Sequence, residues 1–269
     1  MKILRIITIF ILLLLLGYFG ANSYHHAKLY ESTTASIAKH SDINGLTQGK
    51  LDTFTSVISF GLIKNRTKEK LDELKEQQNS HKTDSQEHLY FFMVTLSILI
   101  IFSFTCSLLG STLTLALGSL MSLIFGLLNP ILMVTIHKEV EHLGDVILSF
   151  ESKGILGSIT KLFENGEHIV ALTILLFSVI LPLFKIITLI GTLLFKSSAF
   201  SHHLINFFRH IGKWSMIDVF VVAIFLVYLT SNKGSVSHAE IQIGLYYFLA
   251  YVMLSMVTTI QIQRVLTQE

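Results

Sequence analysis

Charged residues are scarce in this chain. Asp, Glu, Lys and Arg make up 14% of the 269 residues, whereas about a quarter of a soluble domain is charged. Hydrophobic residues make up 51%. This balance indicates that lipid, rather than water, surrounds most of the chain. The formal net charge of +2 is too small to indicate nucleic acid as a partner.

Cysteine and proline are almost absent. Cys106 is the single cysteine, which excludes an internal disulfide and a zinc site built from cysteines. It lies in an apolar stretch, where a cysteine behaves as a small buried hydrophobe. The two prolines, Pro130 and Pro182, both lie inside long apolar runs. Neighbouring membrane helices tolerate such prolines, so we expect each to kink a helix.

Sequence motifs of catalysis are also missing. The chain has no glycine-rich phosphate loop, no His-Glu-x-x-His pattern and no Gly-x-Ser-x-Gly elbow, so nothing favours a hydrolase or an ATPase. Among the histidines, His25 and His26 are adjacent and point in different directions on a helix. His202, His203 and His210 have no acidic or cysteine partner at ligand spacing in their loop. We therefore predict a non-enzymatic protein without a cofactor or a metal site.

Long apolar runs dominate what is present. A bilayer core of about 30 Å needs roughly 20 apolar residues per helix. The block 89–136 is long enough for two crossings, so we expect a tight hairpin that turns near Gly110 and Ser111. The sequence predicts an all-α membrane protein, a polytopic helical bundle of about six transmembrane helices. The six runs are 3–21, 89–109, 118–136, 169–195, 214–230 and 243–262.

The positions of lysine and arginine in the short loops predict the orientation. The loop 196–213 contains three basic residues, among them Arg209, and no acid, which is typical of a cytoplasmic loop. The loop 137–168 has more acidic than basic residues, as expected on the opposite side. Six crossings then place both termini in the cytoplasm. Basic residues near both ends, Lys2 and Arg264, agree with this orientation.

Two segments are expected outside the membrane, on the periplasmic side. Residues 22–88 are dense in charge in their second half and predict a solvated segment with a short amphipathic helix. Residues 137–168 have apolar residues spaced to give one apolar face, which would lie along the membrane surface or cover the mouth of the bundle. The chain thus divides into 1–110, with an anchor helix, the periplasmic segment and a second crossing, and 111–269, a four-helix membrane unit.

The first run, 3–21, has two interpretations. A basic residue before a long apolar run is typical of a signal anchor and of a cleaved signal peptide. The residues after it, Ala21, Asn22 and Ser23, make a poor cleavage site, which favours an anchor that is retained.

Two ionisable residues lie inside predicted membrane helices, where a charge is costly and marks a functional candidate. Lys185 follows Pro182, and Asp218 follows Trp214 and Ser215. At about 1.5 Å per residue, Lys185 and Asp218 lie roughly 16 Å and 8 Å from the cytoplasmic ends of two consecutive helices. If these helices pack antiparallel, the two side chains can meet. We predict a polar network or substrate path formed by these five residues.

Purely structural roles for the same residues remain open alternatives. A lysine can snorkel to the headgroups, and Asp218 in the first turns of its helix can interact with the helix dipole. Trp214 at a helix entrance is typical of an interface anchor.

Four segments together resemble the paraquat-inducible protein A family. They are KWSMIDVF (213–220), LPLFK (181–185), GLYYFLAYVMLSM (244–256) and LLNPIL (127–132), and the resemblance covers residues 118–265. It implies an inner-membrane protein of bacteria with two membranes that works with mammalian cell entry (MCE) domain proteins. In this family the MCE partner forms a tunnel across the periplasm and the membrane unit is thought to pass lipids to or from it.

The resemblance also implies roles for single residues. Lys185 and Asp218 match polar positions of the family's helices. Many members carry two membrane units and zinc ribbons with paired cysteines, whereas this chain has one unit and lacks those cysteines, so no zinc role carries over. The sequence therefore predicts an inner-membrane component of lipid trafficking with membrane lipids and an MCE-domain protein as partners. The alternative is a non-transporting scaffold or stress-response subunit that binds a periplasmic partner.

Overall fold

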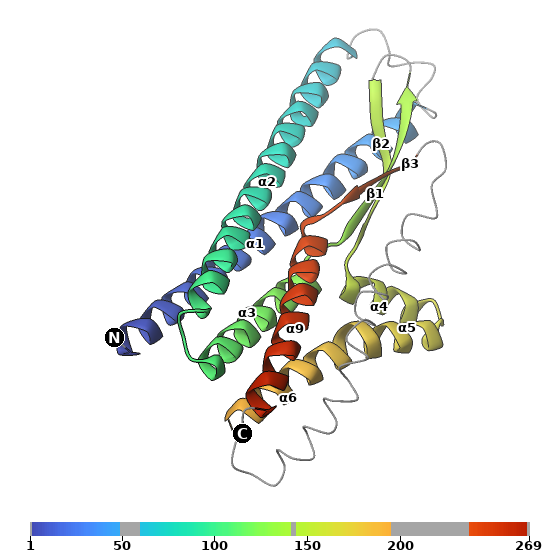
Figure 1. The fold of residues 1–269 in the computed structure, drawn as a ribbon. Helices are drawn as coiled ribbons and strands as arrows, with labels where there is room; N and C mark the ends of the chain where they lie inside the picture. Colours follow the sequence, from blue (N-terminus) through green and yellow to red (C-terminus); the bar gives the residue numbers. More distant parts are fainter. Residues whose placement is uncertain (1, 49–59, 141–143, 195–236, 268–269) are drawn as a thin grey trace.

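The computed structural model describes residues 2–48, 60–140, 144–194 and 237–267. Its longest elements are α1 (Lys2–Gln48) and α2 (Phe60–Ser103), which pack against each other as an antiparallel pair (Figure 1). At about 1.5 Å per residue these helices are about 70 Å and 66 Å long, more than twice the roughly 30 Å of a bilayer core. Each helix therefore extends well beyond the membrane.

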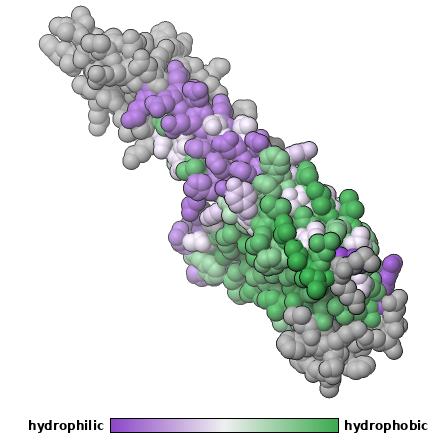
Figure 2. Space-filling view, turned by 90° about the vertical axis from the view of Figure 1, so that its left-hand side faces the viewer, coloured by the Kyte–Doolittle hydropathy of each residue, from purple (hydrophilic) through white to green (hydrophobic). Residues whose placement is uncertain are grey.

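The hydropathy of the surface changes along the two long helices. Figure 2 shows an apolar region in one part of the molecule and a hydrophilic region above it. Residues 22–48 and 60–88 continue the two membrane helices as one pair. The prediction of a separate short amphipathic helix in 22–88 was wrong, because pairing along α1 stabilises the charged half of α2 as part of one long helix.

The helical bundle is confirmed. Five helices of the described residues are long and apolar enough to span a membrane, and they overlap five of the six predicted crossings: Ile3–Ala38, Asp72–Ser103, Leu108–Leu128, His168–Gly191 and Ile243–Ile262. The sixth predicted crossing, 214–230, lies outside the described residues. Both ends of the chain lie at the end of the bundle away from the β-strands (Figure 1).

The hairpin between the second and third crossings turns earlier than predicted. The turn spans residues 104–107, and α3 (Leu108–Leu128) begins directly after it. Ser107 is in an extended conformation, and its Oγ accepts a hydrogen bond from the Gly110 backbone N–H at 3.3 Å. A serine at this position satisfies an otherwise unpaired amide at the helix start, so the cap, rather than Gly110, sets the boundary.

The third crossing ends at Pro130 instead of passing through it. Asn129 adopts φ −80° and ψ 151°, which is the extended conformation that a following proline imposes. The side-chain amide and backbone N–H of Asn129 both donate to the Phe125 carbonyl, at 2.8 Å and 3.1 Å. The predicted helix 118–136, with a kink at Pro130, was therefore wrong beyond Leu128.

A three-stranded antiparallel sheet follows α3, which the expected all-α architecture did not include. Its strands are β1 (Leu132–Val140), β2 (Gly144–Lys153) and β3 (Ser237–Ile241), in the order β2-β1-β3. The register shifts between Ile136 and His137, where a bulge interrupts the pairing of β1 with β2. β2 also contacts α1, so the sheet lies beside the extended part of the long helix pair. Within the segment 137–168, for which the sequence predicts one apolar face, residues 137–140 and 144–153 form strands, because β1 pairs with β2 and β2 packs on α1.

Shorter helices complete the described chain. The amphipathic helix α4 (Ile155–Glu164) buries Ile155 and Ile159, and α5 (His168–Leu175) begins the next crossing. This crossing continues through a five-residue π-turn, η1 (Leu176–Ile180), into α6 (Leu181–Leu194), which packs on α3. The last crossing is α9 (Ile243–Thr267).

Two glycines mark a close approach between α9 and α3 with the residues that follow it. A Cβ at Gly126 would lie 2.9 Å from the Phe248 backbone nitrogen, and one at Gly244 would lie 2.6 Å from the carbonyl oxygens of Asn129 and Pro130. Gly118, Ser122 and Gly126 recur every four residues on α3, the small-residue spacing that lets membrane helices touch.

Most buried hydroxyls of these two helices donate to their own backbone, with Tyr247 and Ser255 of α9 as exceptions. Lipid tails offer no hydrogen-bond acceptor, so a hydroxyl inside the membrane needs an acceptor within the protein. Five hydroxyls donate to the carbonyl four residues earlier in the same helix: Thr112 to Leu108 at 2.7 Å, Thr114 to Gly110 at 2.8 Å, Ser122 to Gly118 at 3.0 Å, Thr258 to Leu254 at 2.6 Å and Thr259 to Ser255 at 2.7 Å. Gln261 of α9 accepts two further bonds from α3, from Ser111 at 3.4 Å and Thr112 at 3.3 Å. Polar side chains thus join α3 to α9 without leaving an unpaired hydroxyl at these positions.

We predict that Gly126→Leu destabilises the bundle by about 1–3 kcal/mol, because the added side chain must push α9 away from α3. Thermal unfolding of the detergent-purified protein measures this as a lower Tm. Gly191→Leu on α6 is the matched control, since no described atom lies within 4 Å of a Cβ built there. Equal Tm values for the two variants would contradict the close packing.

Candidate functional site

A groove lies between α2 and the start of α9 and consists of two adjoining cavities. The first, of about 230 Å³, has polar and apolar lining surface in similar amounts, contributed by Tyr30, Lys82, Ser85, Gln86, Leu89, Ile241, Gln242, Ile243 and Tyr246. The second, of about 340 Å³, is lined almost entirely by apolar surface: Gln86, Leu89, Tyr90, Met93, Tyr246, Leu249, Ala250 and Met253. The cavities share Gln86, Leu89 and Tyr246, so we treat them as one amphipathic groove with a polar and an apolar end.

Lys82 is the one charged residue that lines the polar end, and it contacts Glu240, which lies beside the cavity and not in its lining. Lys82 Nζ of α2 lies 3.0 Å from Glu240 Oε2 of β3, and the Tyr30 hydroxyl of α1 donates to the same carboxylate at 3.5 Å. The Lys82 ammonium also lies 5.9 Å from the centre of the Tyr30 ring. Both charged side chains are partly exposed, at 36% for Lys82 and 48% for Glu240. An exposed pair of this kind is worth about 0–1 kcal/mol, so a ligand can exchange with it at little cost.

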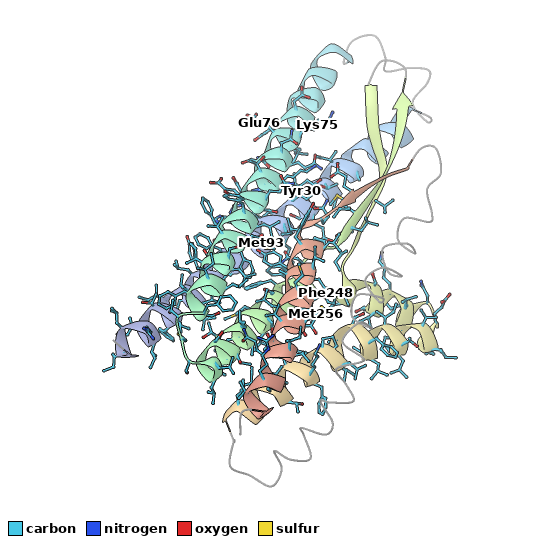
Figure 3. All side chains as sticks on the ribbon, in the orientation of Figure 1. Tyr30, Lys75, Glu76, Met93, Phe248 and Met256 are labelled. Atoms are coloured by element: carbon cyan, nitrogen blue, oxygen red, sulfur yellow. The ribbon has the colours of Figure 1, made fainter. Side chains whose placement is uncertain are left out.

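The apolar end is open toward the side of the bundle. Tyr90, Leu249 and Met253 are 64%, 50% and 63% exposed, although they belong to membrane-spanning helices. Figure 3 shows Met93 on α2 on the side toward α9, below Tyr30. Hydrocarbon surrounds these side chains in a bilayer, so an acyl chain can lie against them without a loss of solvation.

The backbone fixes both walls of the groove. The first turn of α9 is tied to the residues before β1 by the Gln242 N–H, which donates to the Ile131 carbonyl at 2.8 Å, and by the Gly244 N–H, which donates to the Pro130 carbonyl at 2.9 Å. On the other wall, the buried Ser23 hydroxyl of α1 donates to the Ser85 carbonyl of α2 at 3.0 Å. Each wall thus has its own hydrogen-bonded anchor, and the two walls also contact each other where the Phe92 ring of α2 lies 4.7 Å from the Tyr247 ring of α9.

The structure describes two of the five predicted site residues. Pro182 and Lys185 both lie on the buried side of α6, together with Ile186 and Leu189, and Lys185 is only 7% exposed. This stripe has the spacing of one helix face, and α6 packs on α3. The Lys185 side chain therefore faces the interior of the bundle, which is the position expected of a functional intramembrane charge. Trp214, Ser215 and Asp218 lie outside the described residues.

The chain around Pro182 departs from a regular α-helix. The π-turn Leu176–Ile180 ends where the Leu181 N–H donates to the Leu176 carbonyl, five residues earlier. Proline has no N–H to donate and its ring crowds the preceding turn, so a wider turn just before Pro182 relieves the crowding. Pro182 thus places an irregular turn one helical turn before Lys185.

The sequence alone gives little indication that these residues form a groove. Lys82 and Glu240 are 158 positions apart, and each looks like an ordinary surface charge. Only the pairing of β3 with β1 brings Glu240 to α2. The one sequence clue is the position of Lys82 and Gln86, which directly precede the apolar half of α2 and therefore lie at the membrane boundary.

Comparisons with known proteins identify one family and one distant relative. A family model described as "Paraquat-inducible protein A" matches residues 109–268, from the start of α3 to the end of α9. A protein of Haemophilus influenzae named "Probable intermembrane transport protein" is 26% identical over 116 residues. That match covers 40% of this chain and 27% of the Haemophilus protein. No solved structure matches the chain.

A double-mutant cycle tests the predicted pair of Lys185 and Asp218. We expect Lys185→Ala and Asp218→Ala each to destabilise the protein by about 3–5 kcal/mol, because each leaves the opposite charge buried alone. The charge swap, Lys185→Asp with Asp218→Lys, is expected to lose less than the sum of the single changes. Thermal unfolding in detergent measures all four proteins, and wild-type stability in both single variants would reject the pair.

Proposed function

This chain belongs to the paraquat-inducible protein A family, and we propose that it is an inner-membrane component of lipid trafficking that binds a phospholipid in the groove between α2 and α9. The family and the name of the Haemophilus relative both point to membrane transport and not to catalysis. The observation that carries the proposal is the change of lining along one groove, from Lys82 and neutral polar side chains to apolar side chains.

The two ends of the groove complement the two parts of a phospholipid. Lys82 can bind a phosphate oxygen, and Glu240 beside it can bind an ammonium group, so the pair suits a zwitterionic headgroup. Below it, Leu89, Met93 and Met253 offer a surface for an acyl chain, and methionine adapts well to ligands of irregular shape. The charges lie on the hydrophilic side of Leu89 and the apolar residues on the membrane side, which is also the order within a lipid.

The open side of the groove supports exchange with the bilayer. A closed cavity would have to unfold part of the bundle to admit an acyl chain, whereas this groove admits one sideways. The extended ends of α1 and α2 then provide a surface beyond the membrane, where Lys75 and Glu76 lie (Figure 3). We propose that this part lies in the periplasm and faces a tunnel-forming MCE-domain partner.

We also propose that Lys185 and Asp218 form a polar network in the same bundle, with Pro182, Ser215 and Trp214 around it. The burial of Lys185 and the π-turn before Pro182 support this role, because irregular turns beside an intramembrane charge are frequent where helices change shape.

Filling the groove is expected to reduce the lipid that the protein carries. Ala250→Trp places a large ring in the apolar end, and we expect a several-fold drop in phospholipid bound per protein after mild detergent purification. Mass spectrometry of extracted lipids measures the amount and the headgroup class. Val257→Trp is the matched control, since Val257 is 42% exposed on the same helix and does not line the groove.

The polar end is tested in the same assay. Lys82→Met removes the ammonium and keeps most of the side-chain volume, whereas Lys75→Met changes an exposed lysine two turns away on α2. We expect bound phospholipid to fall with Lys82→Met and to stay unchanged with Lys75→Met. A wild-type protein that carries a partner protein but no phospholipid would favour the scaffold function instead.

The orientation has its own test, which uses the single cysteine. In a Cys106→Ser background, we expect Glu76→Cys to react with a membrane-impermeant maleimide in intact spheroplasts, because the extended helices lie in the periplasm. Arg209→Cys is expected to react only after permeabilisation. Labelling of Arg209→Cys from outside would reverse the topology and contradict the periplasmic position of the headgroup site.

A further inference from the structure

A cluster of histidines joins α1 to α2 beside the groove. His26 of α1 and His81 and Asp84 of α2 each offer a ligand atom, and the three atoms lie within 4.8 Å of one another. The His88 ring stacks on the His26 ring with centroids 5.5 Å apart, and the His81 ring lies 5.8 Å from it. All three residues of the triad are partly buried between the helices.

The imidazoles of this cluster are not satisfied by the protein. The Nδ1 atoms of His26, His81 and His88 are buried and accept or donate no hydrogen bond within the described structure. Asp84 Oδ2 lies 3.5 Å from His26 Nδ1, but the two atoms are not aligned as a hydrogen bond. Buried polar atoms without a partner are rare in native proteins and call for a bound water or ion.

The separation of one pair of atoms, on His26 and Asp84, fits a shared metal ion. Around a tetrahedral Zn²⁺ with bonds of about 2.0–2.1 Å, two ligand atoms are about 3.3 Å apart. The 3.5 Å between His26 Nδ1 and Asp84 Oδ2 is close to this separation, and it is longer than a charge-assisted hydrogen bond. On α2, His81 and Asp84 are three residues apart and so lie on one helix face, toward α1.

A simple His–Asp ion pair explains less of the cluster. It would account for His26 and Asp84, but it would leave the buried His81 ring without a role, whereas a metal ion on the triad engages it. Two imidazoles and one carboxylate are also a ligand set that suits zinc and other late divalent transition metals.

We propose that His26, His81 and Asp84 bind one divalent transition-metal ion of the zinc class between α1 and α2. The ion clamps the two helices just beyond the apolar half of each. Lys82 and Ser85, which line the groove, lie on the neighbouring face of the same two turns of α2. A metal here fixes the rotation of α2 and with it the polar end of the groove. The metal site stands on its own geometry and does not depend on lipid binding.

The experiment uses the full-length protein in detergent, purified without a histidine tag and stripped with a chelator. Zn²⁺ is titrated in competition with a metal indicator, and bound metal is counted by elemental analysis after desalting. We expect one tight equivalent for the wild type. His81→Ala and Asp84→Asn are each expected to weaken binding at least about tenfold, which is the smallest loss seen even for residues that only orient a ligand.

His25→Ala is the matched control, because His25 is adjacent to His26 and exposed. It is expected to keep the wild-type affinity and stoichiometry. Asp84→Asn preserves the size of the side chain, so it reports on the ligand even if His81→Ala folds poorly. Zn²⁺ is also expected to raise the Tm of the wild type and not that of Asp84→Asn.

Two outcomes would overturn the proposal. One is an equal affinity for Zn²⁺ in the wild type, His81→Ala and Asp84→Asn, which would assign the metal to other histidines. The other is a wild type that keeps no stoichiometric Zn²⁺ after desalting. Loss of lipid in the groove variants with metal binding intact would separate this site from the proposed function.

Discussion

The close contact of α3 with α9 is the constraint on which the rest of the described structure depends. Lipid tails are as apolar as leucine, so burial of apolar surface does not by itself hold two helices together in a membrane. Small residues do so here, because Gly126 lets α3 touch the Phe248 backbone and Gly244 lets α9 touch the carbonyls before β1. All three hydrophobic clusters of the described residues include side chains from both helices.

This contact decides where the site is built. With the first turn of α9 tied to Pro130 and Ile131, β3 pairs with β1 and brings Glu240 to the helix pair. Helix α2 packs mainly on α1 and meets α9 through fewer contacts, among them the Phe92 and Tyr247 rings. The groove is thus a consequence of helices whose main packing partners differ, and its polar end lies where α2 changes from charged to apolar residues.

The helix pair α1–α2 adds to the family unit instead of merely preceding it. The family match begins at residue 109, yet α2 supplies one wall of the groove and Lys82, and the cluster of His26, His81 and Asp84 lies entirely in the added helices. In our proposal the family unit provides the lipid-facing α9 wall and Glu240, and the added pair provides Lys82 of the headgroup site and a metal clamp that orients it.

The sequence by itself determined five crossings, the intramembrane position of Lys185 and the family. Length and hydropathy of a helix are local properties, and a membrane demands both within one segment. The end of α3 could also have been predicted from the local sequence, because a proline pushes the residue before it, here Asn129, out of the helical conformation. We predicted a kink at Pro130 instead. Only the tertiary structure decided that residues 132–140 form a strand, since the same apolar run suits a helix until β2 and β3 pair with it. It also decided the pairs Lys82 with Glu240 and His26 with Asp84, because contacts between side chains far apart in the chain follow from helix packing and strand register, which no short pattern encodes.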